Sequence, residues 1–329
     1  MVHIGINGFG RIGKSIFIQI LQQSHLKVVA INIPNFDIYN IETYLNYDSC
    51  HQYHSIPNIK VIDQEYFCIG GHKIRVFNHR DAREINWKKY NIDYVIDSTG
   101  AYLTTEKVKL HNVNYVIMCA PPKDETPQFI VDGNHDLYRG EQYISNSSCT
   151  TNSIVPVLKF LEDHYQIESA NFTTIHATTA SQTTIDTNHL DKRTHRSIYN
   201  NIIPHTTGAS KSITKIISSL EGKVFGTSLR VPVINVSLID LNVRLIKKTD
   251  LQTLLKHFQE SNYIQISSGK YLVSSDFNTS TCPSIIDSNA CMSLPNNEFK
   301  LMIWYDNEWS YSHKVIKLVS YISKYNFET

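Results

Sequence analysis

Asn7-Gly8-Phe9-Gly10-Arg11-Ile12-Gly13 follows an apolar run that begins at Val2, and it fits the pattern G-x-G-x-x-G. The first glycine of this pattern permits a tight turn, the second lets the backbone approach a pyrophosphate, and the third lets a helix pack closely on a strand. After the turn, isoleucines recur every four residues from Ile12 to Ile20, which predicts a helix with one buried face. A strand before the turn and a helix after it are the context in which this pattern binds a dinucleotide. We therefore expect cofactor contacts at Gly8, Gly10, Arg11 and Ile12.

The rest of the chain separates into two halves with different strand patterns. The first half continues with apolar runs at 27–32, 93–97 and 115–120, which are typical of buried parallel strands. In the second half, the run at 237–245 alternates strictly between apolar and polar residues, which favours an antiparallel sheet with one covered face. The predicted fold class is α/β, with a Rossmann dinucleotide-binding domain over residues 1–148, completed by a C-terminal helix at 311–329, and an α+β catalytic domain with a mainly antiparallel sheet over residues 149–310.

The composition excludes several classes of function. Lysine and arginine total 31 against 30 for aspartate and glutamate, so the net charge of +1 gives no field suited to nucleic acid or an anionic membrane. No apolar run approaches the ~20 residues that span a bilayer, and no His/Cys cluster has zinc spacing. The six cysteines contain no C-x-x-C pair, which favours reduced thiols. We expect a cytoplasmic protein that has no metal, no membrane segment and no need for a nucleic acid.

The choice between NAD and NADP depends on the end of the second strand. An acidic residue usually stands there, about 20 positions after the glycines, and binds the adenosine ribose. Here the place falls at Asn32-Ile33, and the nearest carboxylate is Asp37. Asn32 and backbone groups can hold the ribose, which favours NAD. A 2′-phosphate would meet no opposing charge at Ile33, so NADP is also possible.

A candidate nucleophile stands at the start of a helix pattern in the second half. Ser147-Ser148-Cys149-Thr150-Thr151-Asn152 precedes apolar positions at Val155, Leu158 and Leu161. A thiol at a helix N-terminus has a lowered pKa, because the helix dipole and free N–H groups favour the thiolate. A cysteine is more often a small buried apolar residue. The hydroxyl-rich surroundings and the helix start favour a reactive Cys149.

Several segments together resemble the glyceraldehyde-3-phosphate dehydrogenase family. They are Ile6-Asn7-Gly8-Phe9-Gly10-Arg11-Ile12-Gly13, Ser148-Cys149-Thr150-Thr151-Asn152, Ile202-Ile203-Pro204, Thr207-Gly208-Ala209, Arg230-Val231-Pro232 and Trp304-Tyr305-Asp306-Asn307-Glu308-Trp309. The resemblance implies phosphorylating oxidation of D-glyceraldehyde 3-phosphate to 1,3-bisphosphoglycerate, with inorganic phosphate as the second substrate and hydride transfer to NAD(P), in glycolysis or gluconeogenesis. It also implies a homotetramer in which the loop near residues 180–203 completes a neighbour's cofactor site.

The same resemblance implies roles for individual residues. Cys149 matches the nucleophile that forms a thioester, and His176 matches its partner, an imidazolium beside the thiolate that later takes the hydroxyl proton. Thr179 and Arg230 match the site of the substrate's phosphate. The other phosphate-binding matches are Ser148, Thr150, Arg196, Thr207 and Gly208, and the cofactor-binding matches are Asn32, Ile33, Arg80, Thr99, Asn307 and Tyr311. For either arginine, Arg196 or Arg230, a surface ion pair is the alternative.

Other functions remain open at this stage. Erythrose-4-phosphate dehydrogenase is a related enzyme that hydrolyses its thioester, and it lacks the stretch present here as Thr206-Thr207-Gly208. A non-catalytic paralogue that binds a nucleotide or RNA would not need the Cys149 and His176 pair. An anabolic, NADP-linked enzyme is the third alternative, since Thr187-Asn188 resembles the small polar loop of plastid members that accept NADP.

Overall fold

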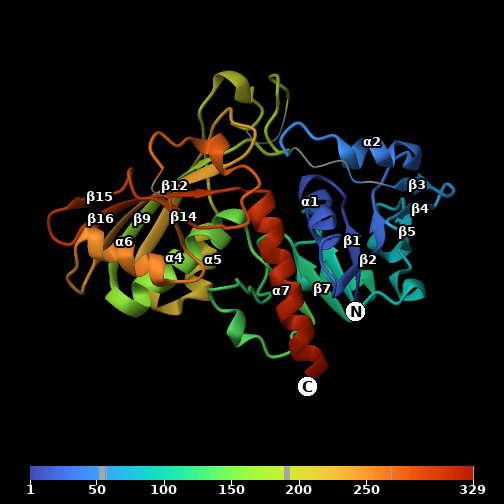
Figure 1. Ribbon diagram of the computed structural model, residues 1–329, viewed down its shortest axis with the longest axis horizontal. Helices are drawn as coiled ribbons and strands as arrows, with labels where there is room; N and C mark the ends of the chain where they lie inside the picture. The colour runs from blue at the N-terminus through green and yellow to red at the C-terminus, as the bar shows by residue number, and fades with distance from the viewer. Residues whose placement is uncertain (52–55, 57, 189–192, 268, 329) are drawn as a thin grey trace. The chain divides into compact units, whose positions relative to one another are not determined.

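The protein divides into two compact units. A computed structural model describes residues 1–51, 56, 58–188, 193–267 and 269–328 (Figure 1). The first unit comprises Met1–Phe129, His135–Ser147 and Ser312–Thr329, and the second comprises Ile130–Asn134 and Ser148–Tyr311. We expected residues 130–134 in the first domain, but they lie with the second unit because Ile130 packs into its apolar core.

The first unit is built on an eight-stranded sheet with the order β3-β4-β5-β2-β1-β6-β7-β8. The strands are β1 (Val2–Asn7), β2 (Leu26–Asn32), β3 (Ile59–Val61), β4 (Tyr66–Ile69), β5 (His72–Phe77), β6 (Tyr94–Asp97), β7 (Tyr115–Met118) and β8 (Tyr143–Ser145). In the spatial order, β5, β2, β1, β6, β7 and β8 pair in parallel with their neighbours. Strands β3 and β4 extend the sheet beyond β5 with antiparallel pairing. The predicted Rossmann arrangement is confirmed, and β1 lies near its centre with the glycine turn at its carboxyl end.

The second unit contains another eight-stranded sheet, with the order β10-β11-β9-β12-β16-β14-β13 and β15 paired to β16. The strands are β9 (Ile167–His176), β10 (Ile203–His205), β11 (Val224–Arg230), β12 (Ser237–Leu245), β13 (Gln265–Ser267), β14 (Ile285–Asp287), β15 (Met292–Leu294) and β16 (Glu298–Tyr305). Most neighbours are antiparallel, although β11 and β9 run in parallel, as do β13 and β14. Along β12 every second residue is buried, as the alternating sequence predicted.

The helices of the described ranges cover these sheets. They are α1 (Arg11–Ile20), α2 (Ile41–Asn46), α3 (Thr105–Val108), α4 (Cys149–Tyr165), α5 (Ala209–Ile216), α6 (Leu251–Glu260) and α7 (Trp309–Glu328). Figure 1 shows α4, α5 and α6 gathered on one side of the second sheet. Among the helices that the structure describes, none has the length and hydrophobicity to cross a membrane.

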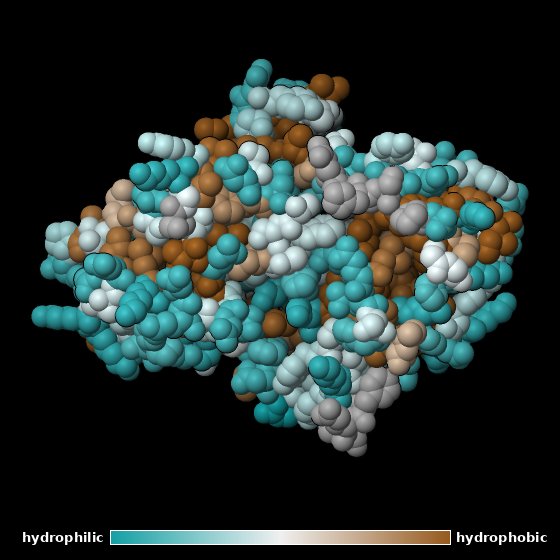
Figure 2. Space-filling view, in the orientation of Figure 1, coloured by the Kyte–Doolittle hydropathy of each residue, from teal (hydrophilic) through white to brown (hydrophobic). Residues whose placement is uncertain are grey.

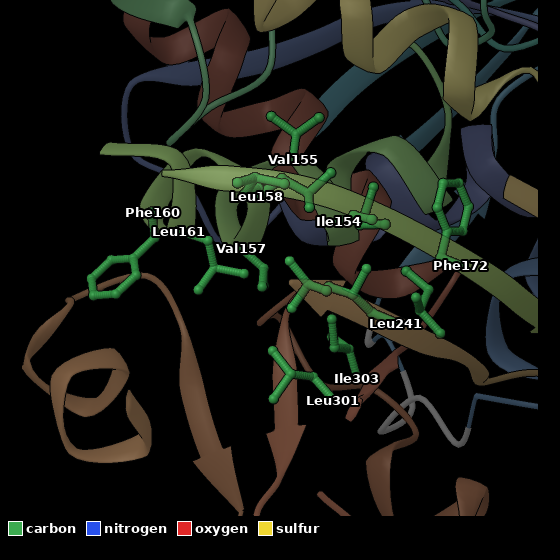
Figure 3. Packing of buried hydrophobic residues seen from close by; sticks show 14 of the residues in the cluster. Ile154, Val155, Val157, Leu158, Phe160, Leu161, Phe172, Leu241, Leu301 and Ile303 are labelled. Carbon is green, nitrogen blue, oxygen red and sulfur yellow. The ribbon is translucent and has the colours of Figure 1, made fainter. Parts of the chain in front are cut away.

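Helix α4 is anchored in the core of the second unit. Its residues Ile154, Val157 and Leu161 are buried in the same cluster as Leu241 of β12 and Ile303 of β16 (Figure 3). Burial of each such side chain stabilises the fold by about 1.5–3 kcal/mol. This packing holds the helix against the sheet, so the first residue of α4 has a defined position relative to the strand ends.

Candidate active site

Cys149 and His176 meet in the second unit. Cys149 is the first residue of α4, and His176 is the last residue of β9. The Cys149 Sγ atom lies 3.4 Å from the His176 Nε2 atom. Residues that are 27 positions apart therefore form a thiol and imidazole pair, an arrangement in which a base can activate a nucleophile.

The start of α4 places hydrogen-bond donors around the sulfur. Ser148 is the N-cap residue, and its hydroxyl oxygen accepts a hydrogen bond of 3.1 Å from the Thr151 N–H. The backbone N–H and the hydroxyl of Thr150 both interact with the Cys149 sulfur. Ser147, with φ of 53°, gives the chain the left-handed turn that leads into this helix. These donors suit a sulfur or a neighbouring oxygen that gains negative charge.

Burial opposes ionisation of the pair. It raises the pKa of the Cys149 thiol, while the Arg230 guanidinium and the Thr150 donors act in the opposite direction. Burial also lowers the pKa of His176 to about 3, and the Arg230 guanidinium adds to this effect. We expected a thiolate beside an imidazolium, and in this setting burial works against both charges. The reason is desolvation, which a sequence pattern does not report.

Arg230 contacts the other nitrogen of the same imidazole. It ends β11, where it pairs in register with His176. The Arg230 Nη1 atom lies 2.7 Å from His176 Nδ1 and 3.3 Å from the carbonyl oxygen of Ala177. The Ala177 oxygen itself lies 2.7 Å from His176 Nδ1. The alternative of a surface ion pair is therefore wrong for Arg230, whose guanidinium lies against His176 of the thiol and imidazole pair.

Four other residues expected to bind phosphate lie in three places. Thr179 begins a turn in which its N–H and hydroxyl bond to the Gln182 side chain, at 2.9 and 3.0 Å. Thr207 precedes α5 and accepts a hydrogen bond of 3.2 Å from the Ala209 N–H, and Gly208 is the N-cap of that helix. Arg196 instead forms an exposed ion pair, with its Nε atom 2.8 Å from Asp186. The surface ion pair that we gave as an alternative describes Arg196 in this structure.

A buried hydrogen-bond network behind the pair was missed by the sequence reasoning. The Tyr305 hydroxyl lies 2.9 Å from Thr150 Oγ1 and 2.8 Å from Thr174 Oγ1. The Ser237 hydroxyl donates to Asn307 Oδ1 at 2.8 Å and accepts from the Ala177 N–H at 3.0 Å. The network joins the start of α4 to three strands of the sheet. Tyr305 lies inside one of the segments that carry the resemblance, so its position in that motif was the available signal.

The glycine turn of the first unit fits a dinucleotide. Gly8 has φ of +86°, and a Cβ atom at Gly13 would lie 2.1 Å from the Gly8 carbonyl oxygen, so both positions require glycine. At Gly10 a Cβ atom would meet nothing within 4 Å, which leaves the backbone open to a pyrophosphate. Arg11 and Ile12 begin α1, and the Arg11 guanidinium lies 2.5 Å from Asp48. The turn therefore combines a tight bend, an open backbone and a helix N-terminus, as this cofactor needs.

The other residues of the first unit that we expected to contact the cofactor differ in burial and in hydrogen bonding. The Asn32 side chain is buried and bonds to Asn7 Oδ1 and to both backbone polar groups of His79, so it supports the turn and has no amide hydrogen left for a ribose. The expected contact with the ribose would therefore have to be made by the second lone pair of the Asn32 Oδ1 atom. Ile33 is half-buried, Arg80 is exposed, and Thr99 donates to Asp97 at 2.6 Å.

Asn307 and Tyr311 both belong to the second unit. They are 4% and 3% exposed, so neither is a surface side chain. The buried carboxamide of Asn307 accepts the hydrogen bond from Ser237, which leaves its amide nitrogen to orient a further group.

Comparisons with known proteins identify one family for both the N-terminal and the C-terminal part of the chain. Residues 2–105 match the family model "Glyceraldehyde 3-phosphate dehydrogenase, NAD binding domain", and residues 148–307 match the corresponding C-terminal domain. The chain is 39% identical to glyceraldehyde-3-phosphate dehydrogenase of Shimwellia blattae, over 98% of this chain and 99% of the relative. It is 38% identical, over the same shares, to glyceraldehyde-3-phosphate dehydrogenase A of Escherichia coli K12 and to the enzyme of Salmonella typhimurium.

Proposed function

We propose that this chain, which belongs to the glyceraldehyde-3-phosphate dehydrogenase family, oxidises D-glyceraldehyde 3-phosphate with inorganic phosphate to 1,3-bisphosphoglycerate. The observation that carries the proposal is the 3.4 Å contact between Cys149 Sγ and His176 Nε2 at the start of α4. A thiol with a base in contact is the apparatus for covalent attack on an aldehyde. The role in glycolysis or gluconeogenesis follows from this reaction.

The chain's own residues carry out the covalent steps. The Cys149 sulfur bonds to the aldehyde carbon, and the thiol proton passes through the imidazole of His176 to the aldehyde oxygen, which gives a thiohemiacetal and leaves the imidazole free to act as a base again. Donors at the start of α4 stabilise negative charge on the substrate oxygen. NAD, when bound, supplies the acceptor for the hydride that leaves the thiohemiacetal carbon. His176 accepts the hydroxyl proton in that step, and phosphate oxygen then displaces the Cys149 sulfur from the resulting thioester.

Two anion sites complete the proposal. Thr179 and Arg230 bind the phosphate of the aldehyde, because a guanidinium and a hydroxyl are effective partners for phosphate oxygens. Ser148, Thr207 and Gly208 bind the attacking phosphate, where hydroxyls and N–H groups near helix starts are available. Arg196 contributes only if its exposed pair with Asp186 opens.

The test measures NADH formation by the purified protein with and without phosphate. Sustained turnover of glyceraldehyde 3-phosphate should require phosphate, and without it each site should release NADH only once, as the thioester accumulates. Sustained, phosphate-independent turnover would instead favour the thioester-hydrolysing alternative. No NADH under either condition, together with tight binding of RNA, would favour the non-catalytic paralogue.

We further propose NAD as the preferred cofactor. The match of residues 2–105 to an NAD binding domain supports this choice. No carboxylate stands at Ile33 to repel a 2′-phosphate, so we expect measurable activity with NADP. Comparison of kcat/KM with each cofactor tests the preference. In Ile33→Asp the NAD:NADP ratio should rise by about tenfold, which corresponds to about 1.4 kcal/mol. An unchanged ratio would show that this position does not select the cofactor.

A homotetramer located in the cytoplasm is the final part of the proposal. Apolar side chains of the second unit are exposed at Ile185 (71%), Ile202 (67%) and Phe225 (65%), as association surfaces commonly are. Figure 2 shows such apolar surface around η6 (Ile198–Asn200), at the top of the view. All six cysteines lie in the described ranges and none forms a disulfide there, in keeping with a reducing compartment. Sedimentation should give four times the chain mass of 37.7 kDa, and a monomer would contradict the assembly.

A further inference from the structure

Three buried side chains of the first unit form a hydrogen-bonded triad that the proposed function has not used. The members of this buried triad are Trp87, His111 and Asp97, which are 1%, 1% and 3% exposed. The Trp87 Nε1–H group donates to His111 Nδ1 at 3.2 Å, and His111 Nε2 lies 2.9 Å from Asp97 Oδ2. The triad therefore joins η3 (Trp87–Tyr90) and η4 (Lys109–His111) to the last residue of β6.

The direction of the hydrogen bonds in the triad follows from the chemistry of the indole. An indole N–H group can only donate, so His111 Nδ1 accepts from Trp87 and carries no proton. The ring proton resides on Nε2, which donates it to Asp97. The Trp87 ring is itself held by packing, because a Cβ atom at Gly5 of β1 would lie 2.8 Å from it. The triad thus directs one fixed donor at the carboxylate of Asp97.

The carboxylate of Asp97 connects the strand ends at the cofactor edge of the sheet. It accepts from the Asn7 amide at 2.7 Å, and from the N–H and hydroxyl of Thr99 at 3.1 and 2.6 Å. The Asn7 Oδ1 atom in turn accepts from the Asn32 amide at 2.7 Å. Asn7, Asn32 and Asp97 are the last residues of β1, β2 and β6, which pair in parallel. A dinucleotide binds at the carboxyl ends of such strands.

The two residues that follow Asp97 pack on the glycine turn. The Ser98 hydroxyl donates to the Gly8 carbonyl oxygen at 2.6 Å, and the Ser98 N–H donates to the Asn7 carbonyl oxygen at 2.8 Å. A Cβ atom at Gly8 would lie 2.7 Å from Thr99 Cγ2. A shift of the Asp97 carboxylate would therefore move the surface on which the glycine turn rests. Binding groups keep their geometry only where the residues behind them are fixed.

We propose that His111 is a positioning residue for NAD, which holds the Asp97 carboxylate and, through it, Asn7 and Thr99 in the arrangement that binds the cofactor. This inference rests on the proposed function and adds a residue that acts through Asp97. The alternative is a histidine that only fills space and satisfies the Trp87 N–H group. The two roles use different ring nitrogens: positioning requires Nε2, whereas the alternative requires Nδ1.

Two amide substitutions separate the two ring nitrogens. In His111→Gln the amide reaches the place of Nε2 and can donate to Asp97, whereas in His111→Asn the shorter amide reaches the place of Nδ1 and can accept from Trp87. Calorimetric titration measures the NAD dissociation constant. His111→Gln should stay within about threefold of the wild type, and His111→Asn should bind NAD about tenfold more weakly, as expected for one hydrogen bond to a charged group. Equal affinities in the two variants, or weaker binding in His111→Gln, would overturn the proposal.

Tyr94 provides the matched control in the same strand. It is the first residue of β6, at the end opposite Asp97, and its buried hydroxyl accepts a hydrogen bond of 2.9 Å from the Asn326 amide. Tyr94→Phe should lose stability in urea unfolding but keep the wild-type affinity for NAD. If Tyr94→Phe weakened NAD binding as much as His111→Asn does, loss of stability would be the cause, and the positioning role would be wrong.

Steady-state kinetics add a readout that a general loss of structure would not reproduce. In His111→Asn the KM for NAD should rise, whereas kcat and the KM for glyceraldehyde 3-phosphate should stay close to their wild-type values. The reason is that Cys149 and His176 belong to the second unit, whereas the triad belongs to the first. An equal change in the KM of both substrates would contradict the proposal.

Thr99→Val keeps the inference testable if both amide variants fail to fold. Thr99 is exposed, and the substitution removes a donor to the same Asp97 carboxylate. Wild-type NAD affinity in Thr99→Val would overturn the proposal. Wild-type NAD binding with phosphate-dependent NADH formation tests the proposed function separately. If the wild type passes that test and the variants bind NAD equally well, only the positioning role is rejected, whereas a wild type that does not bind NAD rejects both.

Discussion

Cys149 Sγ lies 3.4 Å from His176 Nε2, one at the first residue of a helix and the other at the last residue of a strand. If the sulfur is the nucleophile, Cys149→Ser should abolish NADH formation, because a hydroxyl in this position is far less nucleophilic than the sulfur. His176→Asn should lower kcat by about 10²–10⁴, the range that a general base contributes. Steady-state assays of NADH formation measure both effects.

A second cysteine provides the control for this prediction. Burial raises the pKa of the Cys291 thiol to about 11 and the Asp287 carboxylate adds to this effect, whereas the Arg230 guanidinium acts to lower the pKa of Cys149. Iodoacetamide at neutral pH should therefore label Cys149 before Cys291, and Cys291→Ser should keep its activity. Full activity in Cys149→Ser, or preferential labelling of Cys291, would contradict the assignment.

Tyr305 should support both stability and catalysis. Tyr305→Phe removes a hydroxyl that contacts the buried Thr150 and Thr174 hydroxyls, and it leaves them without this partner. The free energy of unfolding should fall by about 1–3 kcal/mol, the usual cost of unsatisfied buried polar groups. Because Thr150 follows Cys149, kcat should fall as well. Urea unfolding and steady-state kinetics provide the two measurements.

Tyr165 tests whether the effect is specific to the start of α4. Its hydroxyl lies 3.0 Å from His257 Nδ1, at the opposite end of the same helix. Tyr165→Phe should leave kcat unchanged, with a loss of stability of about 1 kcal/mol or less. If Tyr165→Phe and Tyr305→Phe reduced kcat equally, the network would have no special relation to the nucleophile.

Two glycines of the same turn should respond differently to alanine. Gly13→Ala places a methyl group 2.1 Å from the Gly8 carbonyl oxygen, and it should lower the free energy of unfolding by about 1–3 kcal/mol. Gly10 has φ of −81° and open space around its Cα, so Gly10→Ala should fold with nearly wild-type stability. Its methyl group occupies the side from which a pyrophosphate approaches, so NAD affinity should fall.

Calorimetric titration of NAD and urea unfolding of both variants decide this prediction. Loss of stability in Gly10→Ala with intact NAD affinity would mean that the open backbone serves folding and not the cofactor. Wild-type stability in Gly13→Ala would mean that the turn can rearrange around the methyl group.

The features predicted from sequence were local, and those that were missed depend on distant contacts. The glycine turn, the helix start at Cys149 and the alternation along β12 each follow from residues within one short segment. The contact of Arg230 with His176 depends on the register of β11 against β9, between residues 54 positions apart. No periodicity in the sequence specifies that register.

The same distinction explains the differences at single residues. The place of Asn32 at the end of a strand did not indicate that its amide bonds to His79 and Asn7, on two other segments. The pKa values of Cys149 and His176 depend on desolvation by the whole second unit. The short strands β3 and β4, of three and four residues, were not predicted.

His313 should make stability depend on pH in a defined window. Burial lowers the pKa of His313 in α7 to about 4 from an ordinary value of 6.5, and Lys317 and Lys314 add to the effect. Between these values the unfolded chain binds a proton that the folded chain does not, so stability falls as the pH decreases from 6.5 toward 4. His313→Gln removes this titration and keeps a polar group near Gln19, which contacts the ring at 3.2 Å.

Urea unfolding at pH 8 and pH 5 measures the effect. At pH 8 the His313 side chain is neutral in both the folded and the unfolded chain. Wild type and His313→Gln should therefore differ in stability only through the lost packing of the ring. At pH 5 the variant should have lost less stability than the wild type, by up to about 1.4 kcal/mol for each pH unit below 6.5 before solvent screening reduces it. An equal loss in both proteins between the two pH values would show that His313 binds its proton equally well in the folded and unfolded chain.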